Sequence, residues 1–356
     1  MSLQFSHRTL GQRVLFGTGQ AADHLAQEVE RLGAQRVMLI ASKSGQRLAE
    51  RVTANIDVHR TYGNIVMHVP VEVAQDARRV ARQYSIDLLV CVGGGSTTGL
   101  AKAIALETGL PILAVPTTYS GSEGTNVWGL TESARKTTGV DDAVLPTTVI
   151  YDAQLSLELA VELSVASGLN AMAHCIDALW GPHANPINQA LSTEGLSALA
   201  TGLPAVVTDP HDLTGREQLL YGTYLSAVAF TSAGSGLHHK ICHVLGGTFD
   251  LPHAQTHATV LPYVLAFNMA AAPHASERIA QALGADDALE GLLALRQRLD
   301  APTKLSDYGL TGDDIAEAVE LTLPVVPASN PRPVTTENLT ALLRAARVGD
   351  DPRGLR

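Results

Sequence analysis

The chain has 356 residues, of which 46% are hydrophobic and 17% are charged. This composition is typical of a well-buried globular enzyme rather than a disordered protein, and the length favours two domains. Lysine and arginine total 25 against 35 aspartates and glutamates, so the net charge is −10. That balance argues against nucleic acid or an anionic membrane surface as the partner.

The cysteines and the chain ends carry little functional signal. Cys91, Cys175 and Cys242 form no CxxC pair, so we expect neither a disulfide framework nor a cysteine-rich zinc site, and a reducing cytoplasm is the simplest location. Cys242 is expected to be a small buried residue rather than a nucleophile. No secretory signal pattern is visible, the longest apolar stretches are predicted to be too short to span a bilayer, and the last residues are expected to fray.

Strand-like and helix-like runs alternate over the first 150 residues. Apolar runs predict strands at 36–41, 87–92, 113–116 and 148–151, and amphipathic patterns predict helices at 23–32 and 74–84. Such alternation indicates a parallel sheet covered by helices on both faces. Beyond Asp152 long segments rich in alanine and leucine replace the strands. We therefore predict an α/β domain at 1–152 and a mainly helical domain at 153–356.

Two glycine motifs are candidates for phosphate binding. Gly17-Thr18-Gly19 approximates a dinucleotide fingerprint, but a tight turn is as good an interpretation, since no acidic residue closes the next strand. Gly93-Gly94-Gly95-Ser96 follows a predicted strand and precedes a predicted helix at 97–108. Three glycines allow a close backbone approach, and the helix N-terminus offers N–H groups to a pyrophosphate, so binding is favoured there over a bare turn.

A polar loop at 116–123 follows the next predicted strand, and it contains Thr117, Thr118, Tyr119 and Ser122. Because loops after neighbouring parallel strands open at the same sheet edge, this loop is expected to reach the same cofactor or the substrate.

Thirteen histidines are present, and several are spaced by four residues. The pairs are Asn170 with His174, His239 with His243, and His253 with His257, and this spacing places each pair on one helix face. A lone histidine is more often structural, but three such pairs favour a shared pocket. Imidazoles so arranged suit a divalent metal, which normally also takes a carboxylate. Asn170 supplies a neutral amide instead, which favours a metal-free site that accepts an anionic substrate.

In combination these motifs resemble the iron-containing alcohol dehydrogenase superfamily, and within it the maleylacetate reductase branch. The resemblance spans nearly the whole chain, through residues 13–17, 93–96, 116–123, 145–152, 168–174, 184–187, 239–253 and 330–333. It implies an N-terminal dinucleotide-binding α/β domain, an all-α C-terminal domain, an active site in the interdomain cleft, and a cytoplasmic homodimer.

The resemblance also assigns roles to residues of the histidine-rich half. The metal ligands of metal-dependent members fall here on Asn170, His174, His239 and His253, and a proton-transferring histidine falls on His243. Asparagine at 170, in place of aspartate, resembles the maleylacetate reductase branch, whose members generally work without a metal. So is Tyr119-Ser120, where alcohol dehydrogenases commonly carry Gly-Thr.

The activity so implied is reduction of 2-maleylacetate to 3-oxoadipate by NAD(P)H in aromatic catabolism, without a metal. The expected substrate-binding residues are Thr118, Tyr119, Asn170, His174, His239 and His253, and the expected catalytic residues are His243, His253 and His174. The expected cofactor-binding residues are Gly93, Gly94, Gly95, Ser96, Thr117, Thr118, Ser122, Lys136 and Ser42.

Ser42 stands where many NAD-specific relatives hold an acid, and Lys43 is adjacent, so NADH use with NADPH also accepted is expected. The alternatives are a metal-dependent alcohol dehydrogenase, an enzyme of the dehydroquinate-synthase type, and a nucleotide-binding sensor without catalysis. The sensor is disfavoured because it has no need of the histidines.

Overall fold

The computed structural model describes residues 4–132 and 135–356, and the chain forms two compact units. One unit is Leu10–Leu159, and the other combines the N-terminal residues up to Thr9 with Ala160–Arg356. The predicted division after residue 152 falls at the start of a short 3-10 helix, η3 (Ala153–Ser156), just before this border.

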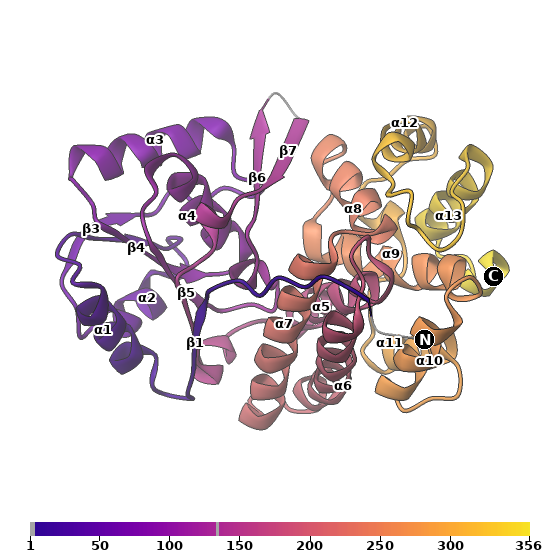
Figure 1. The fold of residues 1–356 in the computed structure, drawn as a ribbon, viewed down its shortest axis with the longest axis horizontal. Coiled ribbons are helices and arrows are strands. Elements are labelled where there is room, and N and C mark those ends of the chain that lie inside the picture. The colour runs from indigo at the N-terminus through magenta and orange to yellow at the C-terminus, as the bar shows by residue number, and fades with distance from the viewer. Residues whose placement is uncertain (1–3, 133–134) are drawn as a thin grey trace. The chain divides into compact units, whose positions relative to one another are not determined.

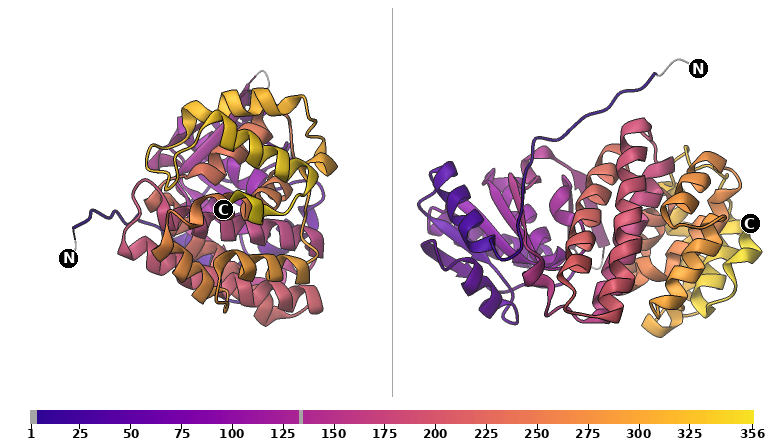
Figure 2. Two further views of the ribbon diagram at one scale, coloured as in Figure 1. Left: turned by 90° about the vertical axis from the view of Figure 1, so that its right-hand side faces the viewer. Right: turned by 90° about the horizontal axis from the view of Figure 1, so that it is seen from below.

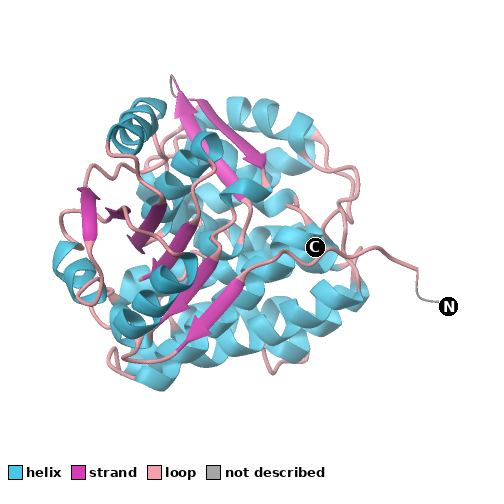
Figure 3. Ribbon diagram, turned by 60° about the vertical axis from the view of Figure 1, so that its left-hand side comes forward, coloured by secondary structure: helices cyan, strands magenta, loops and turns pink. Residues whose placement is uncertain are grey.

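The first unit contains a parallel six-stranded sheet in the order β1-β8-β5-β4-β2-β3, drawn as magenta arrows in Figure 3. Its strands are β1 (Arg13–Phe16), β2 (Val37–Ile40), β3 (Val58–Tyr62), β4 (Leu88–Gly93), β5 (Ile112–Pro116) and β8 (Thr148–Tyr151). Its helices are α1 (Ala21–Leu32), α2 (Gln46–Val52), α3 (Val71–Gln83) and α4 (Gly95–Thr108), with the 3-10 helices η1 (Ser122–Gly124) and η2 (Asp142–Val144).

Alternating side chains of the central strands pack on opposite faces of this sheet. Met38 and Ile40 of β2 join a core built with α3 and α4, whereas Val37 and Leu39 join a core built with α1 and α2. Because successive residues of a strand point to opposite faces, helices must cover both sides to bury them. The prediction of a parallel sheet with helices on both faces is confirmed (Figure 1).

Several elements of this unit escape the sequence patterns. The edge strands β1 and β3 are partly exposed and lack a continuous apolar run. An antiparallel hairpin, β6 (Val127–Glu132) with β7 (Arg135–Val140), was not predicted either. Its half-exposed strands mix glycine, threonine and charged residues, which gives no strong period-two signal.

The second unit is helical, as predicted. Its helices are α5 (Val161–Trp180), α6 (Pro186–Thr208), α7 (Leu213–Ala233), α8 (Leu237–Thr248), α9 (His253–Met269), α10 (Pro273–Ala282), α11 (Ala288–Arg298), α12 (Asp314–Thr322) and α13 (Thr336–Val348). The 3-10 helices are η4 (Leu305–Tyr308), η5 (Leu323–Val325) and η6 (Pro352–Leu355).

The long helices α6 and α7 lie side by side and pack with α5 (Figure 2). Glycines allow the close approach: a Cβ at Gly222 would lie 2.9 Å from the carbonyl oxygen of Gly195, and one at Gly202 would lie 2.7 Å from that of Gly215. Contrary to expectation, α6 is long and apolar enough to cross a membrane by length and composition, with a mean hydropathy of 1.2. A single helix of this kind is weak evidence for a membrane span, and α6 packs against α5 and α7 with 44% of its apolar stretch buried.

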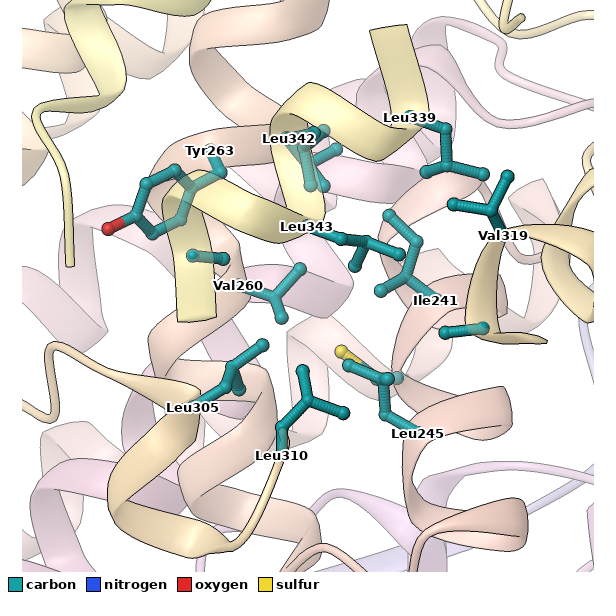
Figure 4. Packing of buried hydrophobic residues seen from close by; sticks show 14 of the residues in the cluster. Ile241, Leu245, Val260, Tyr263, Leu305, Leu310, Val319, Leu339, Leu342 and Leu343 are labelled. Atoms are coloured by element: carbon teal, nitrogen blue, oxygen red, sulfur yellow. The ribbon is translucent and has the colours of Figure 1, made fainter. Parts of the chain in front are cut away.

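Helices α8 and α9, which carry five of the thirteen histidines, pack on α12 and α13 through one apolar core. Figure 4 shows Ile241 of α8 close to Leu343 of α13 and Val319 of α12, and Leu245 of α8 beside Leu310. The chain end contributes to this unit, so the expectation that it frays is wrong. Pro352 is buried, and the Arg332 guanidinium donates to the carbonyl oxygen of Leu355 at 2.7 Å.

Candidate active site

The two polar loops predicted to bind a cofactor lie next to each other. Gly93 pairs with Pro116 where β4 and β5 run parallel, and the Thr117 N–H donates to the Gly93 carbonyl oxygen at 3.1 Å. Both loops therefore leave the sheet at its carboxyl edge, which confirms the prediction that they open on the same side. Helix α4 begins at Gly95, directly after the glycine loop.

The glycines of this loop have no room for a side chain. A Cβ at Gly93 would lie 2.5 Å from Thr97 Oγ1, and a Cβ at Gly94 would lie 2.9 Å from Thr118 Cγ2. Gly93 also has a φ of 154°, which L-residues rarely adopt. A loop without side chains allows a ligand to approach the backbone closely. The adjacent helix N-terminus offers N–H groups and the positive end of the helix dipole, and this arrangement binds a pyrophosphate.

The earlier glycine motif is a structural turn, which resolves the alternatives left open by the sequence. The side chain of Asp152 accepts hydrogen bonds from the Gly19 N–H at 2.8 Å and from the Ala21 N–H at 3.1 Å. The Asp152 carboxylate therefore occupies the N–H groups at the N-terminus of α1, where a phosphate would otherwise bind. Gly19 has a φ of 78°, which the turn requires.

A buried lysine, which the sequence reasoning missed, links α4 to the second polar loop. Lys102 Nζ donates to the carbonyl oxygens of Ser122 at 2.6 Å, Thr125 at 2.8 Å and Val127 at 2.9 Å, and to Thr125 Oγ1 at 2.9 Å. Burial lowers the pKa of Lys102 to about 7, while the buried Glu123 acts in the opposite direction. The lysine thereby fixes the end of the polar loop on the helix that follows the glycines.

Three further predicted residues lie in this unit: Ser42 and Lys136, predicted to bind the cofactor, and Tyr119, predicted to bind the substrate. Ser42 follows β2, and its hydroxyl accepts from the Gly45 N–H at 3.1 Å, with Ser44 Oγ also at 3.1 Å. Tyr119 is fully buried. Lys136 pairs with Thr131 in the backbone register of the hairpin, and its side chain lies outside the described part of the chain.

In the helical unit, six imidazoles from α5, α8 and α9 form one cluster, called here the histidine cluster. Its members are His174, His238, His239, His243, His253 and His257. The His239 ring stacks on His174 with the centroids 4.8 Å apart, and the His253 and His257 centroids are 4.4 Å apart. The structure thus brings together the predicted histidines of three helices. It adds His238 and also Phe230, whose ring centroid lies 4.3 Å from that of His239.

Burial divides this cluster into two classes. His174, His238, His239 and His257 are buried, whereas His243 and His253 are half-buried. Burial lowers the pKa of His174 to about 4 and that of His238 to about 3, and it holds the pKa values of His239 and His257 well below the ordinary value. At neutral pH the buried imidazoles are therefore uncharged.

The acidic partner of the cluster is Asp177, which the sequence reasoning missed. Its Oδ2 atom lies 2.7 Å from His239 Nδ1, and burial raises its pKa to about 6. Asp177 stands seven residues after Asn170 and three after His174, so helical periodicity places all three on one face of α5. That spacing is the signal that predicts a carboxyl group here.

The metal-ligating atoms of the described residues do not gather at the positions named by the resemblance. Within 4–132 and 135–356, the one set of three such residues whose ligand atoms lie within 4.8 Å of one another is His238, Cys242 and His257. His238 Nε2 and His257 Nδ1 share a hydrogen bond of 3.0 Å, and burial raises the pKa of the Cys242 thiol well above its usual range. A thiolate is the ligand form, so these contacts are those of a hydrogen-bonded core cluster. Cys242 is a buried residue, as predicted.

Comparison with known proteins identifies the family. The iron-containing alcohol dehydrogenase model matches residues 11–153, and the model of the C-terminal region of the Fe-containing alcohol dehydrogenase family matches residues 164–347. The maleylacetate reductase of Sphingobium indicum is 44% identical over 353 residues, covering 98% of this chain and 99% of the relative.

Two solved structures extend this likeness to the fold. An iron-containing alcohol dehydrogenase from Corynebacterium glutamicum is 62% identical with a TM-score of 0.98, and 100% of each chain is covered. The maleylacetate reductase of Rhizobium sp. strain MTP-10005 is 41% identical with a TM-score of 0.90, and 98% of this chain and 99% of that chain are covered. The chain therefore belongs to the iron-containing alcohol dehydrogenase family.

Proposed function

We propose that this oxidoreductase is a maleylacetate reductase, which reduces 2-maleylacetate to 3-oxoadipate with NAD(P)H in aromatic catabolism. The observation that carries the proposal is similarity along the whole chain to curated maleylacetate reductases, at 43% identity over 343 residues for that of Burkholderia cepacia. Asn170 on the histidine-bearing face of α5 supports it, since a neutral amide there favours an anionic substrate over a metal.

The loops of the α/β unit hold the cofactor in this proposal. Gly93 to Ser96 receive the pyrophosphate, and Thr117, Thr118 and Ser122 contribute hydroxyl groups from the neighbouring loop. Lys136 and Ser42 contact the riboses. The bound NADH supplies the hydride that goes to the carbon–carbon double bond of the substrate.

In the same proposal the substrate is bound by the histidine cluster together with Asn170, Thr118 and Tyr119. Maleylacetate is a dianion at neutral pH, so its oxygens need hydrogen-bond donors. Because the buried imidazoles are neutral, His174 offers an N–H dipole rather than a positive charge. His243 and His253 are half-buried, which allows them to exchange protons with solvent. His243 is the proposed proton donor to the position that becomes electron-rich after hydride transfer.

The reaction is proposed to proceed without a metal. Asn170 is a weaker ligand than a carboxylate, and within the described residues the ligand atoms of His174, His239 and His253 do not form a set within 4.8 Å. This separation supports the proposal that no tetrahedral zinc or iron centre forms there.

One assay separates the proposal from its alternative, a metal-dependent alcohol dehydrogenase. NADH oxidation is followed after exhaustive chelation with maleylacetate and, in parallel, with small aldehydes. The expected result is full turnover of maleylacetate in the chelated enzyme and little with aldehydes. Aldehyde turnover that disappears on chelation and returns with iron or zinc would establish the alternative.

Three finer properties belong to the same proposal. The enzyme prefers NADH and also accepts NADPH, because Ser42 and the exposed Lys43 present no negative charge to a 2′-phosphate. A preference for NADH of several thousandfold in kcat/KM would overturn this. The enzyme is further proposed to be a cytoplasmic homodimer, and sedimentation of the purified protein measures the oligomeric state.

A further inference from the structure

Asp177 performs two tasks with one carboxylate. Its Oδ2 atom accepts from the backbone N–H groups of Gly236 at 3.1 Å and His239 at 3.2 Å, which are the N-cap and the third residue of α8. Gly236 has no side chain with which to cap its own helix, and a Cβ there would lie 2.6 Å from Asp177 Oδ1. The cap of the histidine-bearing helix α8 therefore comes from α5.

The same Oδ2 atom also contacts the ring of His239. It lies 2.7 Å from Nδ1, and both side chains are buried. An ionised carboxylate can only accept hydrogen bonds, so the proton of the neutral imidazole must be on Nδ1. The other ring nitrogen, Nε2, then carries a lone pair. Within the described residues this buried Nε2 has no hydrogen-bond partner.

We infer that Asp177 is a positioning residue, which holds His239 in the Nδ1–H tautomer and so makes its Nε2 atom a hydrogen-bond acceptor for the reaction. The inference deepens the proposed function and rests on it. It gives His239 a role opposite to that of a donor: Nε2 repels a carboxylate oxygen and receives a hydrogen bond from a proton-bearing group. The enol hydroxyl of a partly reduced substrate and an ordered water are groups of this kind.

Because neighbouring rings hold the His239 ring in place, its tautomer should influence which substrates bind. His174 stacks on His239 with an interplanar angle of 11°, and Phe230 contacts the same ring. These contacts leave His239 little freedom to rotate, so its tautomer determines what it presents. The two carboxylates of the dianion must then be bound by other donors, and an analogue without a proton-bearing group near Nε2 is disfavoured.

The test compares Asp177→Ala with Asp212→Ala. Asp212 caps α7 by accepting from the N–H groups of Thr214 at 2.9 Å and Gly215 at 3.2 Å, so it makes equivalent capping contacts. Each alanine variant loses one side-chain helix cap, whereas only Asp177→Ala also removes the acceptor that holds the imidazole proton on Nδ1. In a serine protease, replacing the aspartate that orients the catalytic histidine by asparagine costs about 10⁴-fold in kcat through the wrong tautomer.

The decisive readout is the position of the proton on His239. The chelated enzyme is labelled with [¹⁵N]histidine, His239→Gln assigns the signals, and two-bond ¹H–¹⁵N spectra distinguish protonated from unprotonated ring nitrogens. We expect Nδ1 protonated in the wild type and in Asp212→Ala, and a shift of proton to Nε2 in Asp177→Ala. With maleylacetate, kcat of Asp177→Ala should fall about 10²–10⁴-fold relative to Asp212→Ala, with a smaller change in KM.

Two outcomes would overturn the inference: a proton on Nε2 in the wild type, or turnover by Asp177→Ala within a few-fold of that of Asp212→Ala. The tautomer measurement needs no substrate, so it remains decisive if maleylacetate is not turned over, and that failure would count against the proposed function alone. If Asp177→Ala does not fold, the wild-type spectrum still decides.

Discussion

Acidification should destabilise the helical unit steeply between pH 6.5 and pH 5, before most carboxylates titrate. His174, His238, His239 and His257 have folded-state pKa values well below the ordinary 6.5, because burial disfavours their charged forms. A group of this kind binds more protons when unfolded. Its stabilising contribution is therefore complete above the unfolded pKa and is lost as the pH falls toward the folded pKa.

Asp177 acts in the opposite direction. Its pKa is raised from 3.8 to about 6 in the folded state, so it binds a proton there and releases it on unfolding near pH 5. Uptake by four histidines and release by one carboxyl group leave a net uptake of about three protons. The free energy of unfolding should then fall by about 4 kcal/mol per pH unit near pH 5, and by roughly 5 kcal/mol between pH 6.5 and pH 5. A typical total stability is about 5–15 kcal/mol.

The assay is urea unfolding of the chelated protein at several pH values, followed by fluorescence of Trp180 at the end of α5. Trp128→Phe removes the other tryptophan, which lies in the α/β unit, so the signal reports the helical unit alone. His238→Gln should lower the slope by about 1.4 kcal/mol per pH unit, whereas His274→Gln, whose side chain is 95% exposed, should leave it unchanged. A slope below one proton in this window would refute the conclusion that burial keeps these rings neutral.

Four substitutions test the roles of single residues. His243→Ala should lower kcat roughly a hundredfold or more, and near-normal turnover would reject it as the proton donor. Lys102→Met leaves four buried oxygens without their donor, so it should cost about 3 kcal/mol or more in urea unfolding and raise the KM for NADH; an unchanged KM would separate the lysine from the cofactor loop. Ser42→Asp should lower kcat/KM for NADPH about tenfold or more with little effect on NADH, since like charges repel, and equal losses for both cofactors would contradict the placement of Ser42. Asn170→Asp in the chelated enzyme should raise the KM for maleylacetate at least tenfold relative to Asn170→Ala, and an unchanged KM would place the dianion away from α5.

The sequence predicts the centre of the α/β unit well and its margins poorly. The buried strands β2, β4, β5 and β8 are apolar runs, and the structure has strands at all four predicted positions. The edge strand β3 reads Val-His-Arg-Thr-Tyr, and its three central residues are exposed. Strand periodicity weakens wherever burial does, and this is why β1, β3 and the hairpin were missed.

The candidate site shows the same division between local and non-local information. Spacing of four residues predicts which histidines share a helix face, and the structure places them in one cluster. Spacing does not reveal that Asp152 caps the N-terminus of α1. Asp152 is 133 residues from Gly19 and 131 residues from Ala21, from whose N–H groups it accepts hydrogen bonds. Nor does spacing reveal that Asp177 caps α8 across 59 residues. Carboxyl groups that satisfy a distant helix end are set by the tertiary fold.

Charge explains why asparagine at 170 matters more than the histidines around it. A divalent ion with one carboxylate and three neutral imidazoles leaves a site with a net charge of about +1. Loss of the ion alone would leave about −1, which opposes a dianion in a buried region where water screens little. In the proposed metal-free site Asn170 brings this set of side chains to neutral, and burial keeps His174 and His239 neutral as well. The remaining carboxylate is that of Asp177, which accepts hydrogen bonds from the N–H groups of Gly236 and His239 and from the His239 ring. These donors offset its negative charge. We propose that a buried cluster of this composition binds an anion through N–H dipoles, and that its selectivity follows from which ring nitrogens carry protons.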